Sequence, residues 1–169
     1  MVQYQHSTVG GHVHKERNDM VFEREQYLAK LIAAKGNGFV KVVTGIRRCG
    51  KSYLLFTLFK NHLLASGINA SHIVEIALDS DEFEELRDPR KLSSFVRTKV
   101  KRLRGPCYVL IDEIQMCEPV KSVVDGSSAS ITFYDVLNGL MKLPGIDLYL
   151  GFLLMSCSAL LVASPTLPS

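Results

Sequence analysis

The sequence predicts a three-layer α/β domain, in which helices cover both faces of a parallel β-sheet. Three observations predict this fold class. An apolar, β-branched run over residues 39–43 leads directly into a Gly-x-x-x-x-Gly-Lys-Ser pattern at 45–52. An apolar helical pattern follows that loop, and a second buried-strand pattern follows the helix at 72–78. Strand, helix and strand in this order form a βαβ unit, which requires a parallel sheet.

Residues 45–52 match the phosphate-binding loop, or P-loop, in the strand-to-helix context that gives this pattern its meaning. Glycines at 45 and 50 allow a tight turn whose N–H groups point at phosphate oxygens, and the helix start adds its own free N–H groups. Lys51 can reach the β- and γ-phosphates, and the Ser52 hydroxyl is placed to bind Mg²⁺. The residues predicted to bind the nucleotide are Gly45, Ile46, Arg47, Arg48, Cys49, Gly50, Lys51, Ser52 and Tyr53.

The composition predicts one globular domain, with 47% hydrophobic and 22% charged residues among 169. The net charge of +3 is too small to indicate nucleic-acid binding by itself. The four cysteines contain no C-x-x-C pair, which predicts reduced thiols in a cytoplasmic protein. Residues 1–19 lack the apolar core of a signal peptide and predict a disordered extension, with Met20 as the hypothetical true start.

The remaining elements are predicted from periodicity and from the residues that end them. An amphipathic helix begins at Asn18 or Asp19 and ends at the Gly-Asn-Gly of 36–38, and Pro-Gly at 144–145 ends a later helix. Residues 123–130, rich in Ser and Gly, predict a loop. The predicted helices span 18–35, 51–66, 89–104 and 131–143, and the predicted strands span 39–44, 72–78, 107–111 and 146–150.

The helix predicted over 89–104 is basic, and this has two interpretations. One is a nucleic-acid-binding face. The favoured one is a solvated helix, because the acidic segment 79–88 before it and the basic residues near its end both complement the helix dipole. No aromatic residue is interleaved on the charged face, so nucleic acid stays an unsupported alternative partner. The basic residues are Arg90, Lys91, Arg97, Lys99, Lys101, Arg102 and Arg104.

A second nucleotide-binding signal is the Walker B pattern at 107–113, where apolar residues precede Asp112 and Glu113. A buried strand of this kind delivers its carboxylates at the edge of a parallel sheet where ligands bind. Asp112 is predicted to hold the Mg²⁺ shell, and Glu113 to polarise the attacking water as general base. Strands often end in acidic residues, so Asp112 and Glu113 alone are weak evidence for a catalytic site. The evidence is stronger because the two carboxylates follow the P-loop with one strand between.

With both motifs located, the chain resembles the N-terminal ATPase domain of two-domain bacterial and archaeal ATPases of the AAA+ superfamily. The resemblance covers residues 20–150 and implies an ATPase with ATP and Mg²⁺ as cofactors. It implies that Lys51 and Glu113 are catalytic, that Gly45 and Gly50 contact phosphate, and that Ser52 and Asp112 bind the metal. It rests on Lys-Val-Val-Thr-Gly-Ile-Arg-Arg-Cys-Gly-Lys-Ser-Tyr-Leu-Leu-Phe at 41–56, Leu-Arg-Asp-Pro at 86–89, Leu-Ile-Asp-Glu-Ile-Gln at 110–115, Val-Leu-Asn-Gly-Leu at 136–140 and Ile-Asp-Leu-Tyr at 146–149.

The chain departs from this family at Gly151. The family continues with Thr-Gly-Ser-Asn, whose Asn senses the γ-phosphate, whereas here no charged residue follows Asp147. We expect the apolar tail, 151–169, to be coding sequence read out of frame. The alternatives are a structural cap and a membrane anchor, for which 148–163 is shorter than the ~20 residues of a spanning helix. The sheet is then expected to be incomplete, with its fifth core strand missing and one edge of the P-loop strand unpaired.

These patterns predict Mg²⁺-dependent ATP binding, with hydrolysis in the intact family member. Glu113 directly after Asp112 favours an ATPase over a kinase, and the chain has no Asn-Lys-x-Asp guanine signature. The rival hypothesis is a non-hydrolysing fragment that binds ATP or a partner. A missing arginine finger alone costs about 10³–10⁵ in rate, so slow hydrolysis is expected. The expected partners are ATP and an unidentified protein, with no membrane.

Overall fold

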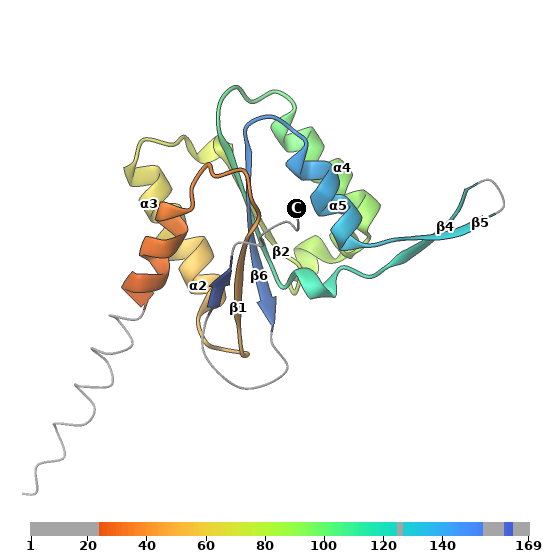
Figure 1. The fold of residues 1–169 in the computed structure, drawn as a ribbon, viewed down its shortest axis with the longest axis horizontal. Coiled ribbons are helices and arrows are strands. Elements are labelled where there is room, and N and C mark those ends of the chain that lie inside the picture. The colour runs from red at the N-terminus through yellow and green to blue at the C-terminus, as the bar shows by residue number, and fades with distance from the viewer. Residues whose placement is uncertain (1–23, 125–126, 154–160, 164–169) are drawn as a thin grey trace, which may run out of the picture.

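A computed structural model describes residues 24–124, 127–153 and 161–163 of the chain (Figure 1). One central sheet carries the fold, and its first four strands run parallel. The last strand pairs antiparallel with the P-loop strand. The order across the sheet is β2 (Ile73–Ala77), β3 (Cys107–Asp112), β6 (Ile146–Leu153), β1 (Lys41–Gly45) and β7 (Leu161–Ala163).

Helices cover both faces of this sheet, which confirms the predicted three-layer α/β fold (Figure 1). Helix 24–33 and the P-loop helix lie on one face, while α4 (Pro89–Val100) and α5 (Phe133–Met141) lie on the other. The P-loop helix is continuous from α2 (Lys51–Tyr53) through a π-helical stretch, Leu54–Phe59, to α3 (Lys60–Ala65). None of the described helices is long and apolar enough to cross a membrane.

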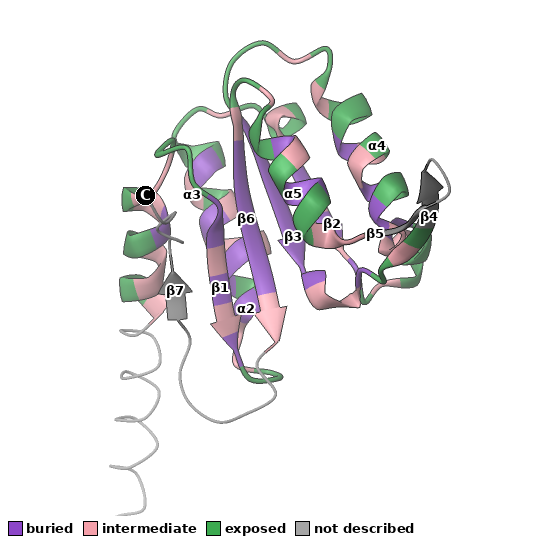
Figure 2. Cartoon of the chain, turned by 45° about the vertical axis from the view of Figure 1, so that its right-hand side comes forward, coloured by how far each residue is buried: buried purple, intermediate pink, exposed green. Residues whose placement is uncertain are grey.

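Two hydrophobic clusters form because successive side chains of a strand point to opposite faces. On β3, Leu110 packs with the P-loop helix, whereas its neighbour Ile111 packs with α4 and α5. Figure 2 shows the result as central strands that are buried along most of their length. The sheet is therefore a rigid platform that fixes whatever lies at the ends of its strands.

α4 and α5 are shorter than the helices that the periodicity predicts, and capping residues fix where they begin. Asp88 accepts a hydrogen bond from the Arg90 N–H at 2.8 Å and places Pro89 in the first turn of α4. Thr132 and Asp135 form a reciprocal capping box, so α5 begins at Phe133 rather than at residue 131. The acidic segment before α4 is itself a run of 3₁₀ turns, Asp81–Arg87.

The prediction of a loop over 123–130 is wrong. The structure has an antiparallel hairpin there, β4 (Val120–Val124) with β5 (Ser127–Ile131), which projects from the body of the domain (Figure 1). The signal that identifies it is local. Valines at 120, 123 and 124 and an isoleucine at 131 flank an Asp-Gly pair, and this pattern is typical of a two-residue hairpin turn.

The strand predicted over 146–150 continues further than expected. β6 runs to Leu153, and its last three residues pair in parallel with Val43, Thr44 and Gly45 of β1. On the other side, Val42, Val43 and Thr44 pair with β7, so the expectation of an unpaired edge on β1 is wrong for these residues. The predicted extension 1–19, and residues 154–160 and 164–169 of the expected tail, lie outside the described residues.

Candidate nucleotide-binding site

The predicted site residues meet at the ends of two strands that β6 separates. Gly45 ends β1 and leads into the loop before α2, while Asp112 ends β3. Both ends belong to the C-terminal edge of the parallel strands, where open α/β sheets bind ligands. The site is therefore built from residues that lie far apart in the sequence.

The loop turns at Gly50, whose φ of +91° lies in the left-handed region that L side chains rarely adopt. A Cβ at this position would also lie 3.5 Å from a guanidinium nitrogen of Arg24, on helix 24–33. The helix then starts at once, because the Gly50 carbonyl accepts the Leu54 N–H at 2.9 Å. The glycine thus joins a tight loop directly to a helix N-terminus, an arrangement that suits anion binding.

Lys51 carries a positive charge that is buried away from solvent. Lys51 is only 4% exposed, and its Nζ lies 3.4 Å from the carbonyl oxygens of Gly45 and Ile46. The same nitrogen lies 3.4 Å from Oε1 of Glu113, which makes a salt bridge between the two motifs. An ammonium group buried in this way needs such partners, since an isolated charge is costly away from water.

Ser52 and Asp112 are in direct contact, with the Ser52 hydroxyl donating to Oδ2 of Asp112. The Glu113 N–H donates to the other carboxylate oxygen at 3.0 Å. Burial raises the pKa of Asp112, and the hydrogen bond from Ser52 and the nearby Lys51 charge only partly counter this effect. Hydroxyl and carboxylate oxygens are the ligand types that Mg²⁺ prefers, so this pair fits the metal expected with a nucleotide.

Glu113 has an unusual backbone conformation and a well-defined side chain. Its φ of +54° is left-handed, which is uncommon for a residue other than glycine. Besides Lys51, its carboxylate accepts a hydrogen bond from the Gln115 side-chain amide. Gln115 in turn accepts the Leu153 N–H at 3.2 Å through its Oε1. The sequence analysis did not predict this link from Glu113 through Gln115 to Leu153. Its only signal in the sequence is a glutamine two residues after Glu113.

Gly151 lies against the same carboxylate. A Cβ at this position would be 1.8 Å from Oδ1 of Asp112 and 3.3 Å from its Cα. Only glycine therefore allows β6 to pass this close to Asp112. The sequence identified Gly151 as the point of departure from the resembled family, and the structure places it beside the predicted metal ligand.

The chain was compared with known proteins, and the model of a family described as an AAA domain matches residues 37–137. The chain belongs to this family. The match includes the P-loop and the end of β3, so the chain carries a nucleotide-binding domain of the ATPase type. The chain is 32% identical over 119 residues to an uncharacterized protein of Haemophilus influenzae. The aligned stretch covers 70% of this chain and 30% of that protein. The chain thus spans about a third of that relative's length. No solved structure matches the chain.

Not every residue of the loop predicted to contact the nucleotide joins the cluster. Arg47 and Arg48 are exposed, and neither makes a hydrogen bond or ion pair within the described part of the chain. Arg24, which sequence reasoning missed, stacks over the Tyr53 ring at 5.6 Å from its centroid. Among the nine predicted positions, Gly45 and Lys51 are buried, Cys49 and Gly50 are half-buried, and Ile46, Arg47, Arg48, Ser52 and Tyr53 are exposed.

The predicted metal ligands are two protein oxygens, from Ser52 and Asp112, in direct contact with each other. No group of three or more His, Cys, Asp or Glu side chains that could hold a metal occurs among the described residues. Mg²⁺ in nucleotide sites is commonly held by one or two protein ligands together with substrate phosphates and water. The contact between Ser52 and Asp112 agrees with that mode and not with a structural metal site.

Proposed function

We propose that this AAA domain binds ATP together with Mg²⁺ and hydrolyses it to ADP and phosphate. The observation that carries the proposal is one cluster in which Lys51, Ser52, Asp112 and Glu113 contact one another at the ends of β1 and β3. We place this activity in the cytoplasm, in keeping with the free thiols of Cys49, Cys107 and Cys117.

Each side chain of the cluster has a distinct role in this proposal. The loop N–H groups and the Lys51 ammonium bind the phosphates. The phosphate oxygens then replace Glu113 as the partner of the Lys51 charge. Ser52 and Asp112 hold Mg²⁺, which neutralises phosphate charge when it is bound. Glu113 accepts a proton from the attacking water, as its half-buried carboxylate is placed beside Lys51 and oriented by Gln115.

Binding is tested with a fluorescent ATP analogue titrated into the purified chain, with and without Mg²⁺. We expect Mg²⁺-dependent binding in the wild type and a loss of at least tenfold in affinity for Lys51→Ala. The matched control is Lys142→Ala, which removes an exposed lysine just after α5 and should bind like the wild type. Equal affinity in Lys51→Ala and wild type would refute the proposed site.

Turnover is tested separately by release of inorganic phosphate. We expect Glu113→Gln to bind ATP with wild-type affinity and to release phosphate at least 100-fold more slowly, since general bases contribute about 10²–10⁴ in rate. If wild type and Glu113→Gln release phosphate equally slowly while both bind ATP, the hydrolytic half of the proposal fails. Binding without turnover, the rival hypothesis, would then be the function of this chain.

A further inference from the structure

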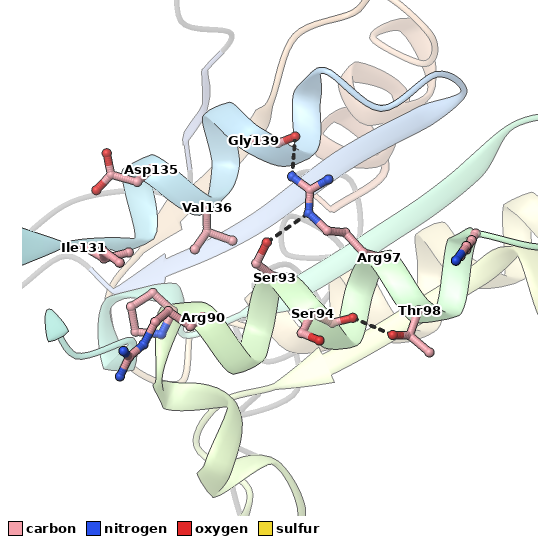
Figure 3. A pocket seen from close by; sticks show the side chains of 11 residues that line it. Arg90, Ser93, Ser94, Arg97, Thr98, Ile131, Asp135, Val136 and Gly139 are labelled. Atoms are coloured by element: carbon pink, nitrogen blue, oxygen red, sulfur yellow. Dashed lines mark hydrogen bonds between the residues drawn. The ribbon is translucent and has the colours of Figure 1, made fainter. Parts of the chain in front are cut away.

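A groove lies between α4 and α5, on the face of the sheet that is opposite the P-loop helix (Figure 3). Its volume is about 560 Å³. Three basic side chains line it from α4 and the residue that follows it, together with two serine hydroxyls, while α5 closes the other side. The residues used below are Arg90, Ser93, Ser94 and Arg97 of α4, and Lys101 directly after it.

These five positions form one row along the helix. Counted from Arg90, they lie at positions i, i+3, i+4, i+7 and i+11, which share one face of a helix. With a rise of about 1.5 Å per residue, the row from Arg90 to Lys101 is roughly 16 Å long. Arginine, lysine and serine are also the side chains that most often contact phosphate and sugar oxygens in nucleic-acid complexes.

Arg97 is fixed in the centre of the groove. Its Nε donates to the Ser93 hydroxyl at 3.2 Å, and its Nη2 donates to the Gly139 carbonyl of α5 at 3.0 Å (Figure 3). Among the described residues, no further hydrogen bond engages the remaining guanidinium N–H groups or the hydroxyl proton of Ser93. A planar guanidinium that is held in this way is suited to phosphate oxygens.

The other cations are more available than Arg97. The Lys101 side chain is exposed, and its ammonium makes no hydrogen bond or ion pair with any described residue; the same holds for the Arg102 and Arg104 side chains just beyond α4. Arg90 pairs with Asp88 at 3.4 Å, but both are partly exposed, and such pairs exchange partners at little cost. The acidic residue of the lining, Asp135, is engaged in capping α5.

We propose that this groove binds the phosphodiester backbone of a nucleic-acid duplex. The row of cations and hydroxyls complements the evenly spaced negative charges of a phosphodiester backbone. None of the described residues that line the groove is aromatic, and Phe95 of α4 packs against Phe83 instead. Single-strand binders rely on stacking of bases on aromatic rings, so the groove reads the backbone and is indifferent to sequence.

The experiment measures fluorescence anisotropy of a labelled 20-base-pair DNA duplex with the full chain between 50 and 200 mM salt. Each neutralised phosphate contributes about −0.9 to the slope of log K against log salt, so three cations predict a slope of about −3. Lys101→Ala should weaken binding and reduce the slope by about 1, with ATP affinity unchanged. Lys142→Ala, outside the groove, should leave the slope unaltered, and thermal unfolding confirms that both variants fold.

Four results would overturn the proposal. One is a duplex affinity that does not respond to salt, and another is an equal loss in Lys101→Ala and Lys142→Ala. The third is tighter binding of the single strand than of the duplex, which would indicate recognition of bases. The fourth is full competition by a polyglutamate peptide at matched charge, which would indicate an acidic protein as the ligand. A failure of ATP binding changes none of these readouts, so the two proposals are tested independently.

Discussion

Asp112 and Glu113 are neighbours in sequence but have different environments. Asp112 is 2% exposed and sits under Ser52 and against Gly151. Glu113 is half-buried and faces Lys51 and Gln115. The left-handed backbone of Glu113 turns the second carboxylate away from the first. In the proposed mechanism, this separation lets one carboxylate act as a metal ligand and the other as a base.

The first prediction concerns the pH dependence of stability. Because burial raises the pKa of Asp112, the folded state binds its proton more tightly than the unfolded state does. The stability that it contributes is present below the ordinary Asp pKa of about 3.9 and is lost as pH rises through the raised pKa. Without nucleotide, Asp112→Asn should therefore raise the melting temperature at neutral pH by about 2–4 °C, equivalent to about 1 kcal/mol.

Thermal unfolding between pH 3 and pH 8 checks this sign. The gain from Asp112→Asn should shrink as the pH falls through the raised pKa and vanish below the ordinary Asp pKa, where the wild-type carboxyl is protonated in both states. Asp79→Asn, at an exposed carboxylate, should show no gain at any pH. A lower melting temperature for Asp112→Asn at neutral pH would contradict the burial argument.

The second prediction concerns Gln115, which joins Glu113 to the end of β6. Removing the amide in Gln115→Ala leaves the base without one of its two orienting contacts. We expect phosphate release to fall about 10- to 100-fold, since small misplacements of a catalytic group cost this much, while ATP affinity stays within twofold. Gln26→Ala, at an exposed glutamine of helix 24–33, should change neither quantity. A loss confined to ATP affinity would show that Gln115 is not a positioning residue.

At the scale of elements, β6 links the two halves of the site. It lies between β1 and β3, pairs with both, and carries Gly151 past Asp112 and Leu153 to Gln115. Periodicity and the Pro-Gly stop before it identified the start of this strand. Its end could not be predicted, because residues 151–155 are a continuous apolar run with no strand-ending signal after Gly151. Pairing with β1 decides how far the strand runs.

The third prediction uses this close approach. In Gly151→Ala the new Cβ would lie 1.8 Å from Asp112 Oδ1, so the carboxylate or the strand must move. We expect a destabilisation of about 1–3 kcal/mol, as for other overpacked positions, and a loss of Mg²⁺-dependent ATP binding of at least tenfold. Chemical denaturation and nucleotide titration measure the two effects.

Gly139→Ala is the matched control for that variant. Gly139 lies within α5, and its Cβ would meet only the flexible end of Arg97, at 3.0 Å. Removing a glycine from a helix stabilises it by roughly 0.5–1 kcal/mol, so this variant should be at least as stable as the wild type. Unchanged ATP binding in both variants would show that Asp112 does not depend on Gly151.

At the scale of the whole molecule, a buried ion pair closes the edge of the sheet opposite the nucleotide site. Lys41 is the first residue of β1 and Asp147 is the second residue of the neighbouring β6, and their side chains form a contact that is almost fully buried. Asp147 also accepts the Gly36 N–H and the Tyr149 hydroxyl, each at 2.9 Å. Burial, with the Asp147 charge, raises the pKa of Tyr149, which keeps its hydroxyl protonated as a donor.

The fourth prediction compares this pair with an exposed one. Lys41→Met leaves Asp147 buried without its counter-charge, and such losses cost about 3–5 kcal/mol. Lys60→Met breaks a partly exposed pair with Glu75, 2.6 Å long, and should cost only about 0–1 kcal/mol. Denaturant unfolding of both variants measures the difference. Comparable losses would indicate that Lys41 contributes through packing and not through its charge.

By itself, the sequence determined the fold class, the phosphate-binding loop and the two carboxylates, because each depends on residues that are close together along the chain. A glycine-rich turn between strand and helix, and an apolar strand ending in Asp-Glu, carry their own local geometry. Only the tertiary structure decided the contacts of Gln115 with Leu153, of Asp112 with Gly151 and of Lys41 with Asp147, and the groove that α5 completes beside α4. Strand register and helix packing bring these distant residues together, and no local pattern in the sequence encodes them.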